Sequence, residues 1–245
     1  MKRRLIVGVD GSAAAERALA WASAAARATD AELLVAHVVD LSLIASPTRA
    51  ERIDDGHRLL ADGVATAFES GVEQASSTLL SGDCAVRLLE LSQGALMIVV
   101  GSQGAGRIPS ILLGSVAFRL AGHADCPVVL VGEHARLPGD PAASAVVVEE
   151  FDADSEVLTF ATALAQAFDK RVVVAASHDA LLAAAQTADV VVLGADRNNV
   201  HRSNPTHAIA SALLHSARCA VAIVGPRTLP GHADGDARDD SESTV

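Results

Sequence analysis

The sequence contains no tyrosine, one tryptophan and only two lysines, Lys2 and Lys170. A surface poor in aromatic side chains has no platforms on which the bases of single-stranded nucleic acid can stack. The formal net charge of −11 also opposes binding to nucleic acid, because cations that neutralise phosphates supply most of that affinity. We therefore expect no nucleic-acid partner.

Long hydrophobic runs are also missing, since none approaches the roughly 18 residues that a membrane span requires. Residues 1–4 carry positive charge, but Asp10 interrupts the apolar stretch that a secretory signal would need. The three cysteines, Cys84, Cys126 and Cys219, form neither a C-x-x-C pair nor a metal-ligand spacing. They are predicted to be reduced core residues, so we expect a cytoplasmic protein with no membrane partner.

Half of the 245 residues are apolar, and they form short buried runs that alternate with helical segments. The predicted strands of the first half are 5–9, 32–39, 72–80, 95–100 and 127–131. The predicted helices are 12–28, 49–69, 83–91 and 114–122. Strands that alternate with helices in this way predict an α/β fold with a doubly wound parallel sheet and right-handed crossovers.

A glycine-rich loop follows the strand at 95–100. It contains Gly101, Gly104 and Gly106, and the pair Gly114-Ser115 then opens the next helix. Glycine permits positive φ and lets the backbone approach a ligand closely. The N-terminus of a helix offers unpaired N–H groups and the positive end of the helix dipole. The loop and helix together predict a phosphate site.

The spacing of these residues, G-x2-G-x9-G-S, resembles the signature of the universal stress protein family. The resemblance covers residues 3–132 well and residues 143–225 weakly. A Walker loop is excluded because neither lysine stands in a G-K-[S/T] sequence. The dinucleotide fingerprint is excluded because it follows the first strand and orders its glycines differently.

The resemblance implies a Rossmann-like sheet of order 3-2-1-4-5 that binds ATP, with Mg²⁺, where the strand order reverses. The binding residues that it implies are Gly8, Val9, Asp10, Val38, Gly101, Gly104, Arg107, Gly114, Ser115 and Val116. It places Asp10 against the nucleoside, the backbone of Val38 against adenine and Gly101 near the ribose. Gly104 and the start of the following helix would surround the phosphates.

Some of these residues, and two nearby histidines, can also be explained without a ligand. Asp10 serves equally well as a cap at the end of a strand, and Gly114-Ser115 as a bare helix cap. Arg107 reads as a solvated loop arginine, and His37 and His123 as surface histidines or histidines with satisfied hydrogen bonds.

No catalytic or metal-binding constellation is recognisable, because the sequence shows no nucleophile–base pair at a motif spacing and no metal-like pair of carboxylates. We therefore predict an ATP-binding sensor or regulator that is not an enzyme. The alternatives are a structural or interaction protein without a ligand and a slow ATP hydrolase.

After residues 137–142, which read as a linker, the pattern of the first half begins again. The predicted strands are 145–148, 171–175, 189–193 and 219–224, and the predicted helices are 155–168 and 208–215. Gly194 and Cys219 follow Gly101 and Cys126 by 93 positions each, so this part aligns without a gap.

Nearer its start the offset is about 139, which leaves about 46 residues missing from the second copy. That length corresponds to the second helix and the third strand. The predicted organisation is a nucleotide-binding domain at 1–136, the linker, a shortened degenerate domain at 143–227 and a disordered acidic tail at 228–245.

The second copy has lost the residues of the predicted site. The 93-residue offset places Arg197 opposite Gly104, His207 opposite Gly114 and Ala208 opposite Ser115. Glu149 or Glu150 stands opposite Asp10. We therefore predict one adenine-nucleotide site in each chain.

The last predicted strand of each copy is apolar and free of internal proline. Left open at a sheet edge, either strand would promote aggregation. We predict that 127–131 and 219–224 pair antiparallel within the chain and form an intramolecular pseudo-dimer, with further homo-oligomers as an additional possibility.

Overall fold

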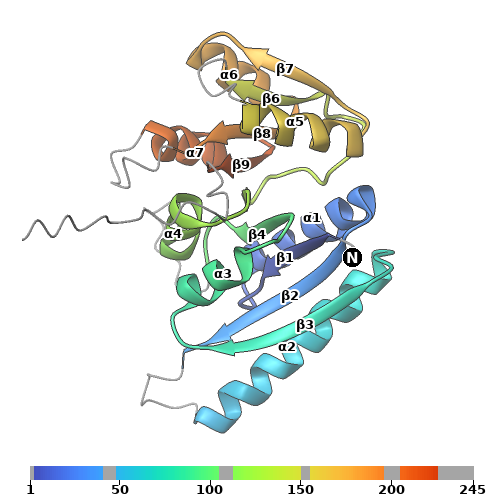
Figure 1. The fold of residues 1–245 in the computed structure, drawn as a ribbon, viewed down its shortest axis with the longest axis vertical. Coiled ribbons are helices and arrows are strands. Elements are labelled where there is room, and N and C mark those ends of the chain that lie inside the picture. The colour runs from blue at the N-terminus through green and yellow to red at the C-terminus, as the bar shows by residue number, and fades with distance from the viewer. Residues whose placement is uncertain (1–2, 41–47, 105–112, 150–154, 196–204, 226–245) are drawn as a thin grey trace, which may run out of the picture.

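The computed structural model describes residues 3–40, 48–104, 113–149, 155–195 and 205–225, in which nine strands form one sheet (Figure 1). The strands are β1 (Arg4–Gly8), β2 (Glu32–Val39), β3 (Ala75–Ser81), β4 (Met97–Gly101), β5 (Val128–Val131), β6 (Ala145–Glu149), β7 (Arg171–Ala175), β8 (Ala188–Gly194) and β9 (Ala220–Val224). The helices are α1 (Ala13–Thr29), α2 (Arg49–Glu69), α3 (Cys84–Ser92), α4 (Ser115–His123), α5 (Ser155–Ala167), α6 (His178–Ala185) and α7 (Pro205–Ser216).

The strands follow the order β3-β2-β1-β4-β5-β9-β8-β6-β7. The first five, which with α1–α4 we call the first half, have the predicted order 3-2-1-4-5. The last four, which with α5–α7 we call the second half, repeat this order from the junction outward but lack a counterpart of β3. The predicted α/β fold with doubly wound strand orders, the second without its third strand, is therefore confirmed, although the strands form one sheet and not two.

Antiparallel pairing occurs between β5 and β9, where Val128, Val129 and Leu130 lie opposite Ile223, Ala222 and Val221. All other neighbouring strands are parallel. The predicted pairing of the two last strands is thus confirmed. It joins the two halves into one continuous sheet.

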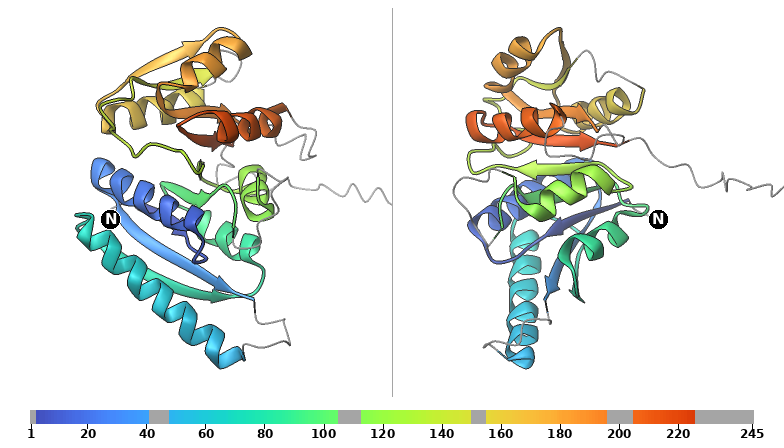
Figure 2. Two further views of the ribbon diagram at one scale, coloured as in Figure 1. Left: turned by 180° about the vertical axis from the view of Figure 1, so that it is seen from behind. Right: turned by 90° about the vertical axis from the view of Figure 1, so that its left-hand side faces the viewer.

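Helices cover both faces of this sheet (Figure 2). Because successive strand residues point to opposite faces, the sheet has two hydrophobic cores. Val7 and Val99 belong to the core that includes residues of α1, α2 and α5, whereas Ile6 and Ile98 belong to the core that includes residues of α3, α4, α6 and α7. Each hydrophobic core extends through both halves. On the first face, Trp21 of α1 meets Phe168 of the second half edge-to-face, with ring centroids 6.0 Å apart.

The helices of the first half begin and end close to where the sequence predicts. Ser12 caps α1 by accepting a hydrogen bond from Ala15 N, and Thr48 and Glu51 form a capping box at the start of α2. The third strand begins at Ala75 and not at position 72. None of the described helices combines the length and hydrophobicity needed to cross a membrane.

Two features of the second half differ from the prediction. No helix is predicted between 175 and 189, yet α6 lies there, with Ser177 as its N-cap. This helix consists mainly of alanine and leucine, so it carries no clear amphipathic pattern. Helix α7 begins at Pro205, three residues before the predicted start at 208.

The segment predicted as a linker is hydrogen-bonded to the second half. The Lys170 ammonium donates to the carbonyls of Asp140 and Ala143, at 2.9 Å in each case. The Gly139 amide donates to the carboxylate of Asp189 at 3.0 Å. The predicted disordered tail lies outside the described residues.

Candidate functional site

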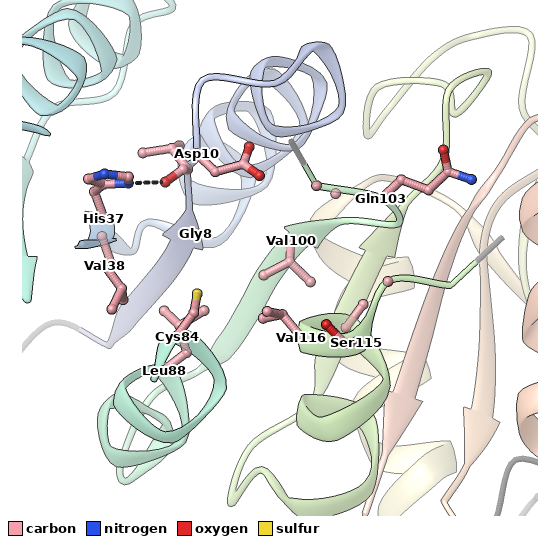
Figure 3. Close-up of a pocket in the computed structure, with 16 residues that line it drawn as sticks. Gly8, Asp10, His37, Val38, Cys84, Leu88, Val100, Gln103, Ser115 and Val116 are labelled. Carbon is pink, nitrogen blue, oxygen red and sulfur yellow. Dashed lines mark hydrogen bonds between the residues drawn. The ribbon is translucent and has the colours of Figure 1, made fainter. Parts of the chain in front are cut away.

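A cavity of about 340 Å³ opens where β1, β2 and β4 end, between the first turns of α3 and α4 (Figure 3). It is lined by Gly8, Val9, Asp10, Ala36, His37, Val38, Cys84, Leu88, Val100, Gly101, Gln103, Gly104, Gly114, Ser115, Val116 and Ala117. Strand order reverses between β1 and β4, and in open parallel sheets ligands bind at this position.

The cavity brings together nine of the ten residues predicted to bind a ligand. They are Gly8, Val9, Asp10, Val38, Gly101, Gly104, Gly114, Ser115 and Val116. The tenth, Arg107, lies outside the described residues. These residues come from three strand ends and one helix start. They are up to 108 positions apart in the sequence, yet they line one cavity.

The glycines of the signature do not depend on positive φ, contrary to one of the two reasons that the sequence offered for them. The positive-φ glycines among the described residues do not include Gly101, Gly104 or Gly114. Close packing explains two of them. A Cβ on Gly101 would stand 2.8 Å from the backbone carbon of Ala14, and one on Gly104 would stand 2.7 Å from Asp10 Oδ2.

Asp10 performs the local capping role that the sequence offered as its alternative. Its Oδ1 accepts hydrogen bonds from Ser12 N at 3.0 Å and from Ser12 Oγ at 2.6 Å. Ser12 Oγ in turn caps α1. The same aspartate lines the cavity, so the cap also fixes a carboxylate at the cavity wall.

Helix α4 begins at the cavity with no side-chain cap. Its N-cap is Gly114, whose own amide donates to Ser102 O at 2.8 Å. The intrahelical ladder starts where Phe118 N donates to Gly114 O, so the N–H groups of Ser115, Val116 and Ala117 have no partner within the helix.

The other helices for which a cap is described differ from α4 in this respect. Each of them has a side chain that accepts from its first turn: Ser12 for α1, Thr48 for α2, Asp83 for α3 and Ser177 for α6. Helix α4 therefore presents its N-terminal N–H groups, and the positive end of its dipole, to the cavity.

His37 lines the cavity although it is not among the predicted site residues. Its Nδ1 lies 2.7 Å from Val9 O, and because a carbonyl only accepts, Nδ1 must carry the proton and donate. The interpretation of His37 as a histidine with a hydrogen-bond partner is therefore correct. This bond ties the end of β2 to the end of β1 and leaves Nε2 without a proton when the ring is neutral.

Cys84 begins α3, and its sulfur is drawn toward the cavity in Figure 3. Burial raises the pKa of its thiol to about 11, and the negative charges of Asp10 and Asp83 act in the same direction. The thiol is thus neutral at pH 7. Together with Leu88, Val100 and Val38 it forms an apolar wall.

An ion pair fixes the two helices that flank the cavity. Arg119 of α4 donates to both carboxylate oxygens of Asp83, at 2.8 Å each. The Val86 amide and Arg119 hold the pKa of Asp83 below its usual value.

Among the described lining residues Asp10 is the only charged one. Within the described part of the chain no group of three or more metal-ligating side chains is found.

The corresponding region of the second half is built differently. Helices α4 and α7 end at equivalent positions, but α7 starts three residues earlier, so His207 and Ala208 lie inside its first turn and not at its N-cap. Strand register places Glu149 opposite Gly8, which corrects the predicted match to Asp10. The position of Arg197 lies outside the described residues.

The strand order and the cavity at its reversal define a doubly wound α/β protein with a cavity at the switch point. The chain belongs to the universal stress protein family, whose model matches residues 1–132. A universal stress protein of Mycobacterium tuberculosis is 29% identical in an alignment of 186 positions that covers 71% of this chain and 62% of the relative. This chain thus spans less than two-thirds of that relative's length.

The same fold is found in a solved structure along nearly the whole chain. A universal stress protein from Archaeoglobus fulgidus matches 91% of this chain and 98% of its own, with a TM-score of 0.71 and 15% identity. A universal stress protein solved in complex with cAMP matches 53% of this chain and 97% of its own, with a TM-score of 0.45 and 25% identity.

Proposed function

We propose that the protein binds ATP, together with Mg²⁺, in the cavity of the first half and acts as a nucleotide-dependent sensor or regulator. The observation that carries this proposal is the uncapped start of α4. The N–H groups of Ser115, Val116 and Ala117 meet the cavity without a side-chain acceptor. Such a helix end favours the oxygens of a phosphate.

The rest of the cavity suits a nucleoside. The apolar wall of Val38, Cys84, Leu88 and Val100 offers a surface for a flat base, and Asp10 offers hydrogen-bond acceptors to hydroxyl groups. No lysine or arginine stands among the described lining residues. In this proposal Mg²⁺ enters with the triphosphate and offsets its charge.

We further propose that residues 1–136 form the nucleotide-binding domain and that, after the linker at 137–142, residues 143–227 form a degenerate domain that binds no nucleotide. The early start of α7 supports this division, because it removes the counterpart of the open helix end. The three free cysteines support a location in the cytoplasm.

Isothermal titration calorimetry with ATP and Mg²⁺ tests the proposal. We expect a stoichiometry near one nucleotide per chain and an upward shift of the thermal midpoint, since a ligand that binds only the native state stabilises it. Two equivalent sites would contradict the assignment of the second half. If millimolar ATP produces no heat and no thermal shift, the proposal of nucleotide binding is contradicted.

A pair of substitutions at Gly114 tests the helix end itself. Gly114→Asp supplies the missing cap with a negative charge, whereas Gly114→Ala adds only the β-carbon. A Cβ there meets its nearest atom at 3.5 Å, so the β-carbon that both variants add is accommodated. We expect the aspartate to weaken ATP binding at least about tenfold more than alanine does, or ~1.4 kcal/mol, while slightly stabilising the fold. Equal effects would show that phosphates do not bind at α4.

A structural protein without a ligand is the second candidate, and one observation favours it. Gly101 and Gly104 are explained by their packing against Ala14 and Asp10 without any ligand. This candidate predicts that Gly114→Asp stabilises the protein and that ATP shifts the midpoint of neither variant. The same thermal scans therefore decide between the two candidates.

A further inference from the structure

Strand β7 lies at one edge of the sheet, at the top of Figure 1. Among the described strands it pairs with β6 alone. The backbone N–H and C=O groups on its outer side therefore have no described strand beside them. An edge of this kind is a template for pairing with another chain.

Comparison with the first half shows which elements are missing beside β7. Register places Val174 of β7 where Val35 stands in β2. Val35 is fully buried, because β2 pairs with β3 and because α2 lies over it, with Gly63 close to its side chain. Val174 is 49% exposed, since the second half lacks both elements.

Strand β7 carries a single charge, Arg171 at its start, and the rest of the strand has none of the usual protection of an edge. Residues 172–175 are three valines and an alanine, without charge or proline. The opposite edge, β3, contains three serines and a threonine and is covered by α2 on one face. Exposed edges normally carry a charge, a proline or a bulge that prevents association.

We propose that β7 pairs antiparallel with β7 of a second copy of this chain, about a two-fold axis that passes by Val173. In this register Val173 lies opposite itself and Val172 lies opposite Val174. Arg171 faces Ala175, and Lys170 faces Ala176. This inference does not depend on nucleotide binding.

The charges around β7 are compatible with this register. No charged residue faces another of the same sign, and the two basic ends lie at opposite ends of the paired strands. Arg171 of each chain lies alongside the turn that leads into the partner's α6, whose first turn carries Asp179. The net charge of −11 on each chain repels at long range, so the dimer should tighten as salt screens that repulsion.

An antiparallel pair of apolar strands already occurs within the chain. At the junction of the two halves, β5 and β9 pair antiparallel through uncharged valine, leucine, isoleucine and alanine residues. Strand β7 has a similar run of valine and alanine at the other edge of the second half.

The chain's own C-terminal residues suit this edge less well than a second copy does. They follow β9, which is separated from β7 by β8 and β6. Residues 226–245 include five acidic residues, two prolines and two glycines, whereas the edge is apolar. Acidic residues, proline and glycine are all depleted in strands.

Sedimentation equilibrium of the full chain tests the proposal. We expect a dimer at micromolar concentrations and a tighter one at higher salt. Val174→Lys, which places a charge on the apolar edge, should raise the dimer dissociation constant at least about tenfold. Phe68→Lys is the matched control, because Phe68 is 50% exposed on α2, and it should change nothing.

A cysteine pair tests the register. Directly opposed residues of antiparallel strands have Cα atoms about 4.5–5.5 Å apart, within the range that a disulfide spans. Val173→Cys should therefore form an intermolecular disulfide under mild oxidation. Val174→Cys lies off the axis, about two residues from its own copy, and should not, although its side chain is exposed.

Several outcomes would overturn the proposal. A monomeric wild-type chain at all concentrations and salt levels would do so, whether the β7 amides are then protected from hydrogen exchange by the chain's own tail or are unprotected. A dimer that Val174→Lys leaves intact, or one that crosslinks equally through both cysteine variants, would also overturn it.

Discussion

Helices α4 and α7 occupy equivalent places in the two halves but begin differently. Both end at equivalent residues, His123 and Ser216, and both precede a strand that takes part in the central antiparallel pair. Helix α4 begins at a glycine beside the cavity, whereas α7 begins three residues earlier with a proline. The strands of the junction are therefore preserved, whereas the helix start beside the cavity is not.

The comparison separates two kinds of constraint. The junction requires β8, β9 and the cores that extend across them, because β5 would otherwise be an open edge. The cavity requires an open helix end and small residues at the strand ends. The second half keeps the junction strands and Gly194, while α7 begins three residues before the position that corresponds to the start of α4.

Removal of the second half should have the largest effect. A chain truncated after Gly139 loses β9, so the apolar residues Val128 and Leu130 of β5 become an exposed edge. We expect this truncated chain to dimerise or aggregate, as measured by sedimentation velocity, with circular dichroism to verify that helices are retained.

A charge on that edge provides the control. Val129→Lys in the truncated chain should reduce self-association, because an edge lysine opposes strand pairing. A folded, monomeric truncated chain with the native β5 sequence would contradict the role given to the second half.

Replacing Gly104 by arginine, the residue that stands opposite it in the second half as Arg197, should have the next largest effect. Gly104→Arg places a Cβ only 2.7 Å from Asp10 Oδ2 and extends a long side chain from the cavity wall. The carboxylate is a side-chain end that can move, so the fold should survive. Calorimetry should show ATP binding lost or weakened by more than about 100-fold, ~2.7 kcal/mol.

The converse substitution sharpens the comparison. Arg197→Gly restores the glycine in the second half, but α7 still begins at Pro205 and has no open glycine cap. We expect the stoichiometry to remain near one. A second site created by this single change would show that the loop residue, and not the helix start, decides nucleotide binding.

The sequence predicted much of this arrangement because its strongest signals are local and periodic. Ser12 and Thr48 mark the helix starts, and the buried strands are runs of valine, leucine and isoleucine. The spacing from Gly101 to Ser115 located the cavity wall. Internal repetition predicted the β5–β9 pair, because both strands lacked polar residues.

What the sequence did not predict depends on contacts between distant segments. Nothing near His37 indicates that its ring would bond to Val9 O, since the register of β1 and β2 decides that contact. The packing of Gly101 against Ala14 likewise arises only after α1 folds over β4. Helix α6 was missed because a short run of alanine and leucine has no distinguishing period.

The smallest predicted effect concerns Asp189, which follows the first residue of β8 and has no partner in the register with β6. The position 93 residues earlier, in the first half, is Leu96. Asp189 is fully buried, and only its Oδ2 has a hydrogen-bond partner in the described structure, the Gly139 amide at 3.0 Å. Burial raises the pKa of its carboxyl, and the Gly139 amide partly opposes this.

A raised pKa in the folded state means that the native protein holds this proton more tightly than the unfolded chain does. The contribution of Asp189 to stability is therefore greatest below the ordinary aspartate pKa of about 3.9 and falls as pH rises through the raised value. Asp189→Asn keeps the acceptor for Gly139 and cannot ionise. Urea unfolding from pH 4 to pH 7 should show the variant gaining stability relative to the native chain.

Asp189→Leu, which installs the residue of the first half, separates the charge from the hydrogen bond. It removes the same ionisation but leaves the Gly139 amide without its acceptor, at a cost of about 1–3 kcal/mol. Both variants should therefore have the same flattened pH profile, with the leucine variant less stable at every pH. Parallel profiles for the native chain and the asparagine variant would show that the Asp189 carboxyl titrates alike in the folded and unfolded chains. The connecting segment would then be held by the hydrogen bonds of Lys170 and Gly139 without any dependence on the charge of Asp189.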